Sequence, residues 1–211
     1  MVRKLNQALL SVAVAAAAVF APTAHATIGF ADVVLGYFDS GAGPMAGPYG
    51  GLAGIGGAFP VAVPTSVVLG SDIAGLETWL SLPTGSSITV GFLDETVIDG
   101  IGNDIFIQEI GAAGERANVF VSSDNVNFVF LGIANDSTTT SFDLASIGFA
   151  FAVTAIRIVG LDNGGGSPGF DVVNIQVLPG SIGPGTVPEP GTLALVGLAV
   201  AGAGLARSRK S

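Results

Sequence analysis

The sequence predicts an all-β fold, a jelly-roll β-sandwich, on three observations. No segment between the two ends keeps the 3.6-residue hydrophobic period of an amphipathic helix. Short apolar runs rich in Val, Ile and Phe recur instead, separated by Gly, Pro, Asn, Asp and Ser. The chain has 211 residues, 49% of them hydrophobic and none of them cysteine, so the fold must be held by core packing without disulfides.

Nine strands are expected along the chain. The apolar runs place them at Val33–Phe38, Ser66–Leu69, Thr78–Leu82, Ile88–Phe92, Ile105–Ile110, Ala117–Ser122, Phe128–Ile133, Ala152–Val159 and Phe170–Val177. The Asp-Asn-Val-Asn stretch at 124–127 is typical of a hairpin connection between two of them. Nine short strands at this spacing favour two packed sheets.

Two glycine-rich stretches are expected to be loops. Gly41 to Gly57 also contains Pro44 and Pro48, and Asn163 to Pro168 separates the last two predicted strands. Neither stretch stands between a strand and a helix, which is the context that a phosphate-binding loop requires.

The first 26 residues have the three parts of a secretory signal peptide. Arg3 and Lys4 supply the positive region, Ala8 to Ala21 is apolar, and Ala24 and Ala26 are the small residues that signal peptidase inspects. Fourteen apolar residues form a helix about 21 Å long, shorter than a bilayer core of about 30 Å. We therefore expect a signal helix that is cleaved after Ala26, and not a membrane anchor.

The C-terminus also has three parts in a fixed order. An extended segment with two prolines comes first, then an apolar run from Thr192 to Ala206, then a basic cluster. The residues concerned are Pro188, Glu189 and Pro190 in the first part and Arg207, Arg209 and Lys210 in the last. The apolar run is short but can form a transmembrane helix, with the basic tail on the cytoplasmic side.

These three parts resemble the PEP-CTERM sorting signal of Gram-negative bacteria. The resemblance implies recognition near the Pro-Glu-Pro triplet by an exosortase, a transient stay in the inner membrane, and delivery to the cell surface or an exopolysaccharide matrix. The chain is then divided into a signal peptide at 1–26, an extracellular β-sandwich domain at 27–185 and a sorting segment at 186–211.

The second half of the domain is similar to discoidin-like, galactose-binding-like β-sandwiches of bacterial surface proteins. The resemblance covers about residues 88–178. It is carried by Val97–Glu109, the "A-x-V-x-V-S-x-D-x-x-x-F" pattern at 117–128, Asp143–Ala145, Ile156–Ile158 and Gly169–Asp171. It implies a jelly roll and, as in some relatives, sugar binding or a structural calcium ion. No sugar-binding motif of that group aligns here residue by residue.

Composition excludes several kinds of chemistry. The predicted domain has no histidine, cysteine or lysine, because the one histidine, His25, precedes the expected cleavage point. Catalysis by a Ser-His-Asp or Cys-His arrangement, zinc bound by nitrogen or sulfur, and Schiff-base formation are therefore excluded. Fifteen acids between Asp32 and Asp171 face two basic residues, a net charge of −13 that argues against nucleic-acid binding.

Carboxylates are the remaining candidates for a catalytic site. Two carboxyl groups about 5–9 Å apart can hydrolyse a glycosidic bond. Five acids are candidates for that role: Asp94, Glu95, Asp99, Asp104 and Glu109. The predicted domain offers only one Trp and two Tyr to stack on sugar rings, and Asp in a glycine-rich turn commonly shapes the backbone. The sequence therefore favours a protein that is not an enzyme.

Structural calcium is the one cofactor that the sequence suggests. Ca²⁺ takes oxygen ligands, and Asp99, Asn103 and Asp104 offer them within one turn. The resemblance to discoidin-like sandwiches adds Asp171 of the last strand as a partner. The spacing is not that of an EF-hand, and solvated turn acids remain the alternative.

Arg157 is expected to make a structural ion pair. It lies between Ile156 and Ile158 in a predicted strand, so its side chain faces away from theirs. As one of two cations in the domain, it is expected to pair with Glu109 or Asp171.

Three functions remain open. The first is a structural or adhesive protein of the cell surface or matrix, without enzymatic activity. The second is a carbohydrate-binding module for the exopolysaccharide of the cell, and the third is a carboxylate-dependent glycoside hydrolase. The expected partners are signal peptidase, exosortase, the inner membrane and an exopolysaccharide, with no nucleic acid.

Overall fold

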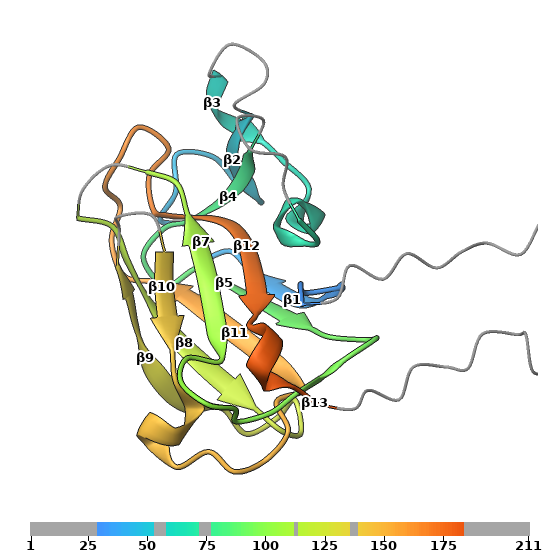
Figure 1. Ribbon diagram of the computed structural model, residues 1–211. Coiled ribbons are helices and arrows are strands. Elements are labelled where there is room, and N and C mark those ends of the chain that lie inside the picture. Colours follow the sequence, from blue (N-terminus) through green and yellow to red (C-terminus); the bar gives the residue numbers. More distant parts are fainter. Residues whose placement is uncertain (1–28, 53–57, 72–76, 112–113, 136–138, 184–211) are drawn as a thin grey trace, which may run out of the picture.

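Two antiparallel β-sheets pack face to face in this computed structural model, which describes residues 29–52, 58–71, 77–111, 114–135 and 139–183 (Figure 1). The five-stranded sheet has the order β1 (Val33–Phe38), β5 (Ser87–Gly91), β11 (Ala155–Gly160), β8 (Arg116–Ser122) and β9 (Val129–Asn135). The six-stranded sheet has the order β10 (Thr139–Phe142), β7 (Ile105–Glu109), β12 (Phe170–Val177), β4 (Thr78–Leu82), β2 (Tyr49–Leu52) and β3 (Ala58–Ala62). The predicted all-β sandwich is confirmed.

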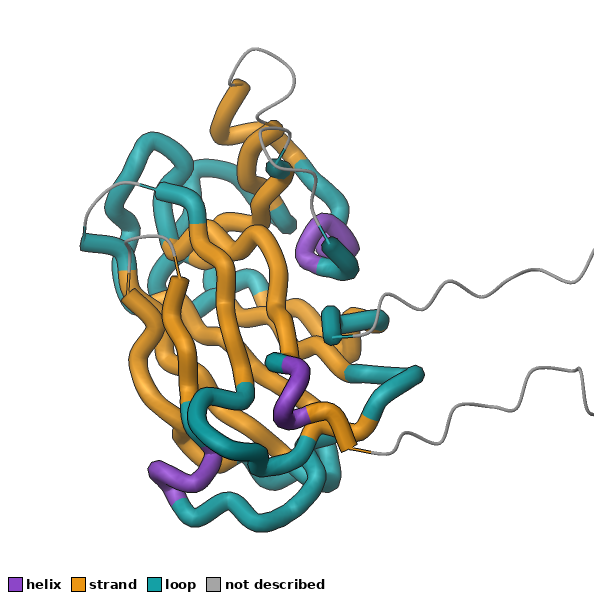
Figure 2. The backbone as a smooth tube through the Cα atoms, viewed as in Figure 1, coloured by secondary structure: helices purple, strands orange, loops and turns teal. Residues whose placement is uncertain are grey.

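Short elements complete the described part of the chain. β6 (Thr96–Val97) and β13 (Ile182–Gly183) pair with each other beside the main sheets. Three single turns of 3₁₀-helix occur at η1 (Thr65–Val68), η2 (Leu144–Ile147) and η3 (Pro179–Ser181) (Figure 2). The expected signal helix within 1–26 and membrane helix within 192–206 lie outside the described residues. No helix in the described part of the chain has the length and hydrophobicity of a membrane span.

The core lies between the two sheets and follows the period-2 pattern of the strands. On β8, the alternate residues Ala117, Val119 and Val121 are fully buried. On β11, Ile156 and Ile158 are fully buried while Arg157 between them is only half-buried, as its position in the strand predicts. These inward faces pack against apolar residues of β4, β7 and β12 in one cluster.

Two segments differ from the sequence-based prediction. The expected strand at Ser66–Leu69 is the 3₁₀ turn η1, in which Val67 N–H bonds to the Pro64 carbonyl and Leu69 N–H to the Ser66 carbonyl. Val68 of this turn is fully buried. One turn of helix therefore places an apolar side chain in the core without a partner strand.

The predicted loop at 41–57 contains strand β2. Gly50 and Gly51 of this strand lie so close to Trp79 of β4 that a Cβ atom on either glycine would overlap the Trp79 carbonyl or its ring. The glycines that argue for a loop in the sequence therefore permit a close approach of two strands. Strands β3, β6, β10 and β13 were also not predicted.

Candidate ligand-binding pocket and acidic clusters

A pocket of about 320 Å³ lies at one end of the six-stranded sheet, the end where β7 finishes and β12 begins. Its lining residues come from distant parts of the sequence: Phe59, Trp79, Ile110, Gly111, Glu115, Gly166, Ser167 and Asp171. In Figure 1 this end carries β3, above the top of β7. Its volume is at the lower end of the range of small-molecule sites, about 300–1,000 Å³.

Strand register places Asp171 in this pocket. Asp171 of β12 lies directly opposite Ser81 of β4, and the residues that flank both are core residues. Since side chains alternate along a strand, Asp171 and Ser81 point to the outer face of the sheet. The Ser81 hydroxyl donates a hydrogen bond to Asp171 Oδ1, and the Ser167 hydroxyl lies 2.7 Å from that of Ser81.

Glu115 reaches the same pocket from the other sheet. It directly precedes β8, and its side chain is 1% exposed. Its carboxylate oxygens accept no hydrogen bond from a described basic, amide or hydroxyl donor, and their hydrogen-bonding neighbour is another acid, Glu109. A Cβ atom on Gly111 or Gly165 would overlap this carboxylate, so glycine at both positions leaves room for it.

Burial and repulsion from neighbouring acids raise the pKa values of both acids. Burial, then the negative charge of Asp171, and then the Glu109 side chain raise the pKa of Glu115 to about 9. Burial likewise raises the pKa of Asp171 to about 8, with a further rise from Glu109 that the Ser81 hydrogen bond opposes. Both carboxyl groups therefore hold their protons at neutral pH.

An aromatic wall closes the other side of the pocket. The rings of Phe59 and Trp79 lie with centroids 5.9 Å apart at an angle of 52°. Trp79 is almost buried, whereas Phe59 is half-exposed at the mouth. The pocket thus combines an aromatic, apolar wall with carboxyl and hydroxyl groups that can both donate and accept hydrogen bonds.

The residues predicted to bind calcium do not all meet. The carboxylates of Asp99 and Asp104 lie together, within 4.8 Å of each other and of Asp143. Asp171 lies near the opposite end of β12, because Asp104 directly precedes Ile105, which pairs with Val177 at the end of that strand, and the Asp104 carbonyl accepts a hydrogen bond from Leu178 N–H. Asn103 is exposed beside Asp104. Calcium at this turn stays a prediction.

Asp104 already has three donors and organises this end of the sandwich. Its Oδ1 accepts hydrogen bonds from Gly100 N–H at 2.8 Å and from the Ser181 hydroxyl, and its Oδ2 accepts one from Leu144 N–H at 2.6 Å. The side chain is fully buried. It therefore joins three separate loops, which is a structural role that a buried carboxylate performs well.

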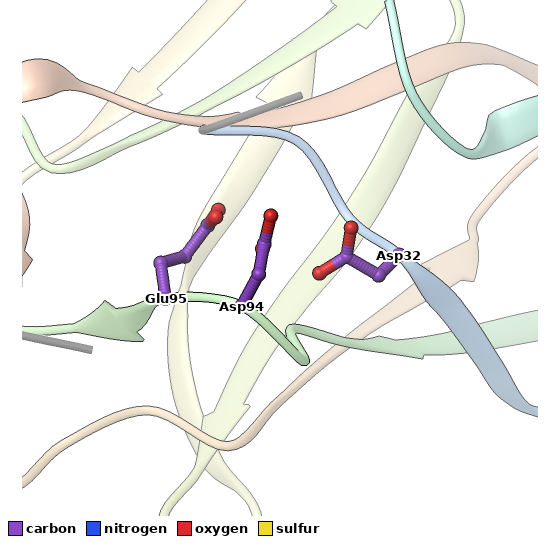
Figure 3. Close-up of side chains that lie close together, drawn as sticks. All are labelled: Asp32, Asp94 and Glu95. Atoms are coloured by element: carbon purple, nitrogen blue, oxygen red, sulfur yellow. The ribbon is translucent and has the colours of Figure 1, made fainter. Parts of the chain in front are cut away.

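A second acidic cluster consists of Asp32, Asp94 and Glu95, with one carboxylate oxygen of each within 4.8 Å of the others. Asp32 directly precedes β1, and the other two lie between β5 and β6. Figure 3 shows Asp94 between Glu95 and Asp32. The sequence predicted two of these acids as catalytic candidates, but did not place Asp32 beside them.

Arg157 does not make the predicted ion pair. Its Nε donates to the Thr89 hydroxyl at 3.1 Å, and its guanidinium lies 3.7 Å from the centre of the Phe128 ring. It belongs to the five-stranded sheet, whereas Glu109 and Asp171 belong to the other sheet. Arg157 lines a second, more polar depression of about 330 Å³ with Tyr37 and Ser87 among its neighbours.

Glu115 and Phe59 are pocket residues that the sequence did not predict. A signal for Glu115 exists, because it continues the alternate series of Ala117, Val119 and Val121, which points into the protein. No comparable signal marks Phe59, since its position beside Trp79 depends on the pairing of β2 with β3 and β4.

The C-terminal sorting signal is found by comparison with protein families: the PEP-CTERM protein-sorting motif matches residues 186–210. This motif indicates an exported protein. It lies outside the residues that the structure describes. No curated protein matches the sequence.

Several solved structures are similar to the sandwich. A chitosan-binding module of a chitosanase/glucanase from Paenibacillus sp. IK-5 has 12% identity and a TM-score of 0.43, over 72% of this chain and 96% of that one. The CpGH89CBM32-4 module of Clostridium perfringens has 10% identity and a TM-score of 0.41, over 63% and 93%. The C-terminal domain of a chitobiase from Bacteroides fragilis has 10% identity and a TM-score of 0.40, over 71% and 100%.

The first of these structures is named as a chitosan-binding module, and the second carries CBM32 in its name. Their identities of 10–12% and TM-scores below 0.5 are too low to transfer a ligand or an activity. The function of this chain must therefore be argued from its own pocket.

Proposed function

We propose that this exported protein binds a polysaccharide and that one sugar residue of the polymer enters the pocket between Phe59 and Glu115. The ring of a sugar presents C–H groups on its face, which pack against aromatic rings, and hydroxyl groups around its edge, which need hydrogen-bond partners. The pocket offers both kinds of surface on opposite sides.

The observation that carries the proposal is the Glu115 side chain. A carboxyl group that is 1% exposed and whose hydrogen-bonding neighbour is another acid, Glu109, costs free energy unless a further donor reaches it. Sugar hydroxyls would satisfy these oxygens. Ser167 and Asp171 extend the same polar floor, so a bound sugar could be held by several hydrogen bonds at once.

The titration of Glu115 and Asp171 favours binding over hydrolysis by this pair of carboxyl groups. Cleavage of a glycosidic bond needs one protonated carboxyl group as the acid and one ionised carboxylate as nucleophile or base. With pKa values of about 9 for Glu115 and about 8 for Asp171, both are protonated at neutral pH. The pocket therefore suits a ligand that is held without being broken.

A purely structural role does not explain why this pocket contains buried acids. Protein stability alone favours paired or solvated carboxylates, and exchanging such buried acids for apolar residues is commonly stabilising. The cost of keeping Glu115 and Asp171 buried supports ligand binding over a structural protein that binds no glycan.

The segments at the two ends of the chain would direct the export of this module. Signal peptidase would remove residues 1–26, and the apolar segment within 192–206 would hold the protein in the inner membrane until an exosortase acts near Pro188–Pro190. The module would then reach the cell surface or the exopolysaccharide matrix of a Gram-negative bacterium. Its binding of that polymer would tether matrix and cell.

The test compares two phenylalanines that differ in position but are both exposed. Phe59→Ala removes the aromatic wall, and Phe151→Ala removes an exposed ring elsewhere on the sandwich. The full chain in mild detergent is screened on a glycan array, and the affinity for the best soluble polysaccharide is measured by isothermal titration. Loss of one aromatic stacking contact of about 1–1.5 kcal/mol weakens binding about tenfold.

We expect that tenfold loss for Phe59→Ala and unchanged affinity for Phe151→Ala. Reducing ends should not accumulate during the incubation. Absence of glycan binding by the unmodified chain, or equal affinity of both variants and the unmodified chain, would refute the proposal.

A further inference from the structure

A separate feature, the cluster of Asp32, Asp94 and Glu95, lies where the first described residues of the chain meet the sandwich. Gly29 N–H donates to Glu95 Oε1 at 3.1 Å, and Leu93 N–H donates to Asp32 Oδ2 at 2.7 Å. One carboxylate oxygen of each acid lies within 4.8 Å of the others, with Asp94 between Glu95 and Asp32 (Figure 3). The pocket proposed to bind sugar contains none of these three residues.

Three oxygens of the cluster are buried and accept no hydrogen bond from a described donor outside the cluster, because their hydrogen-bonding neighbours are the other acids. They are both carboxylate oxygens of Asp94 and Oε2 of Glu95. Glu95 is 8% exposed, so water does not supply the missing partners easily. Buried carboxylate oxygens that lack donors and converge on one point indicate a missing positive charge.

No basic side chain provides that charge within the described residues. The two cations there are Arg116 and Arg157. Arg157 lies against Phe128 and Thr89, and Arg116 is exposed at the start of β8, which lies two strands away from β5 in the sheet. Three adjacent acids are thus left without a counter-ion from the protein.

We propose that Asp32, Asp94 and Glu95 bind one Ca²⁺ ion. Calcium binds carboxylate oxygens at about 2.3–2.6 Å, so two ligand oxygens on opposite sides of one ion lie about 4.6–5.2 Å apart. The ligand oxygens of the three acids lie within 4.8 Å of one another, which matches this spacing. Magnesium needs shorter bonds of about 2.0–2.1 Å and keeps several waters, which suits a buried cluster of three carboxylates less well.

Three adjacent carboxylates repel one another, and this repulsion makes the cluster costly to bury without a cation. A bound divalent cation would remove this repulsion and join the segment before β1 to the connection between β5 and β6.

The ion would therefore stabilise the place where the N-terminal segment joins the sandwich. Gly29 also accepts a hydrogen bond from Val177 N–H, and Phe30 forms a β-bridge with Gln176, so this segment lies along the last long strand. Calcium binding would hold it there once the chain has left the cytoplasm, where calcium is scarce, and folded outside.

The test uses calcium chloride as the probe and compares two acidic clusters of the same chain. Asp94→Asn removes one charge from the proposed site, and Asp99→Asn removes one from the turn that also contains Asp104 and Asp143. The full chain in mild detergent is titrated with Ca²⁺ and Mg²⁺, and its melting temperature is measured in excess Ca²⁺ and in EDTA by circular dichroism.

We expect one Ca²⁺ per chain and a rise in melting temperature of about 5–10 °C at one hundred times Kd. Asp94→Asn should weaken Ca²⁺ binding at least tenfold, and in EDTA it should melt at the same temperature as the unmodified chain or higher, because a repulsive charge is gone. Asp99→Asn should keep the affinity for Ca²⁺. Should Asp94→Asn fail to fold, Asp32→Asn replaces it.

Three results would overturn the assignment. These are no Ca²⁺ binding, equal affinity for Mg²⁺, and a loss of Ca²⁺ affinity in Asp99→Asn that equals or exceeds the loss in Asp94→Asn. Since glycan binding is measured separately on Phe59→Ala, failure of this proposal leaves the proposed sugar pocket untouched.

Discussion

Replacement of Glu115 by glutamine should remove one part of the pH dependence of the unfolding free energy, while Asp171 and Glu95 keep their own parts. The folded protein holds a proton on Glu115 up to a pKa of about 9, whereas the unfolded chain releases it near the ordinary value of 4.5. The unfolded state is therefore favoured increasingly as the pH rises through this window. The stability is present in full below about pH 4.5 and is lost progressively up to about pH 9.

The size of the effect follows from the displaced pKa. One pKa unit corresponds to about 1.4 kcal/mol, so this single group could cost about 4 kcal/mol of unfolding free energy between pH 5 and pH 8.5. Part of the rise in the pKa of Glu115 comes from the negative charge of Asp171. That part of the free energy depends on both residues and is not assigned to Glu115 alone. About 2 kcal/mol is therefore expected for Glu115 alone. Glutamine has nearly the same shape but no proton to lose, so it removes this contribution.

The assay is urea unfolding of the full chain in mild detergent with EDTA, at pH 5 and at pH 8.5. Trp79 is the one tryptophan of the sequence and reports unfolding by its fluorescence, with circular dichroism as the second probe. The matched control is Asp99→Asn, which removes a negative charge from an exposed side chain. Glu115→Gln should be more stable than the unmodified chain at pH 8.5 by about 2 kcal/mol and similar to it at pH 5. The reasoning is refuted if the unmodified chain is equally stable at both values, or if Glu115→Gln keeps its full pH dependence.

Two further predictions concern the other end of the sandwich and the end of the chain. Asp104→Ala should lower the unfolding free energy by about 3 kcal/mol, because three buried donors lose their acceptor, while Asp104→Asn should cost less. Urea midpoints of both variants check this, and an alanine variant within about 0.5 kcal/mol of the unmodified chain would contradict it. The double substitution Pro188→Ala and Glu189→Ala should leave the protein uncleaved in the inner membrane, as fractionation and immunoblotting would show. Normal processing and export of that variant would disprove the role assigned to the sorting motif.

The prediction of strands succeeded where each strand carries its own pattern. Val33–Phe38, Thr78–Leu82 and Phe170–Val177 have the same bounds in the structure as in the prediction. Their alternation or their enrichment in β-branched and aromatic residues is local information. The prediction failed at β2, because its Gly-Gly pair signals a loop locally, while the structure uses it to bring the backbone against Trp79.

The candidate sites were predicted only in part for the same reason. Asp99 and Asp104 were predicted together because they share one turn, and their carboxylates do lie close together. Asp171 was joined to them by resemblance, yet register places it opposite Ser81 at the far end of β12. Asp32 lies beside Asp94 although 62 positions separate them, and no local pattern connects the two.

By itself, the sequence determined the all-β class of this protein and its export. Strand periodicity is a short-range property, and a sorting motif such as that at 186–210 is read as a linear segment, so neither depends on distant contacts. The tertiary structure alone decided which acids meet and which are buried. Glu115, Asp171, Phe59 and Trp79 come from separate strands or their ends, and antiparallel pairing between residues far apart in the chain sets their positions. Since a carboxyl group changes its pKa only when burial and neighbours act on it, the chemistry of both acidic sites arises only in the folded sandwich.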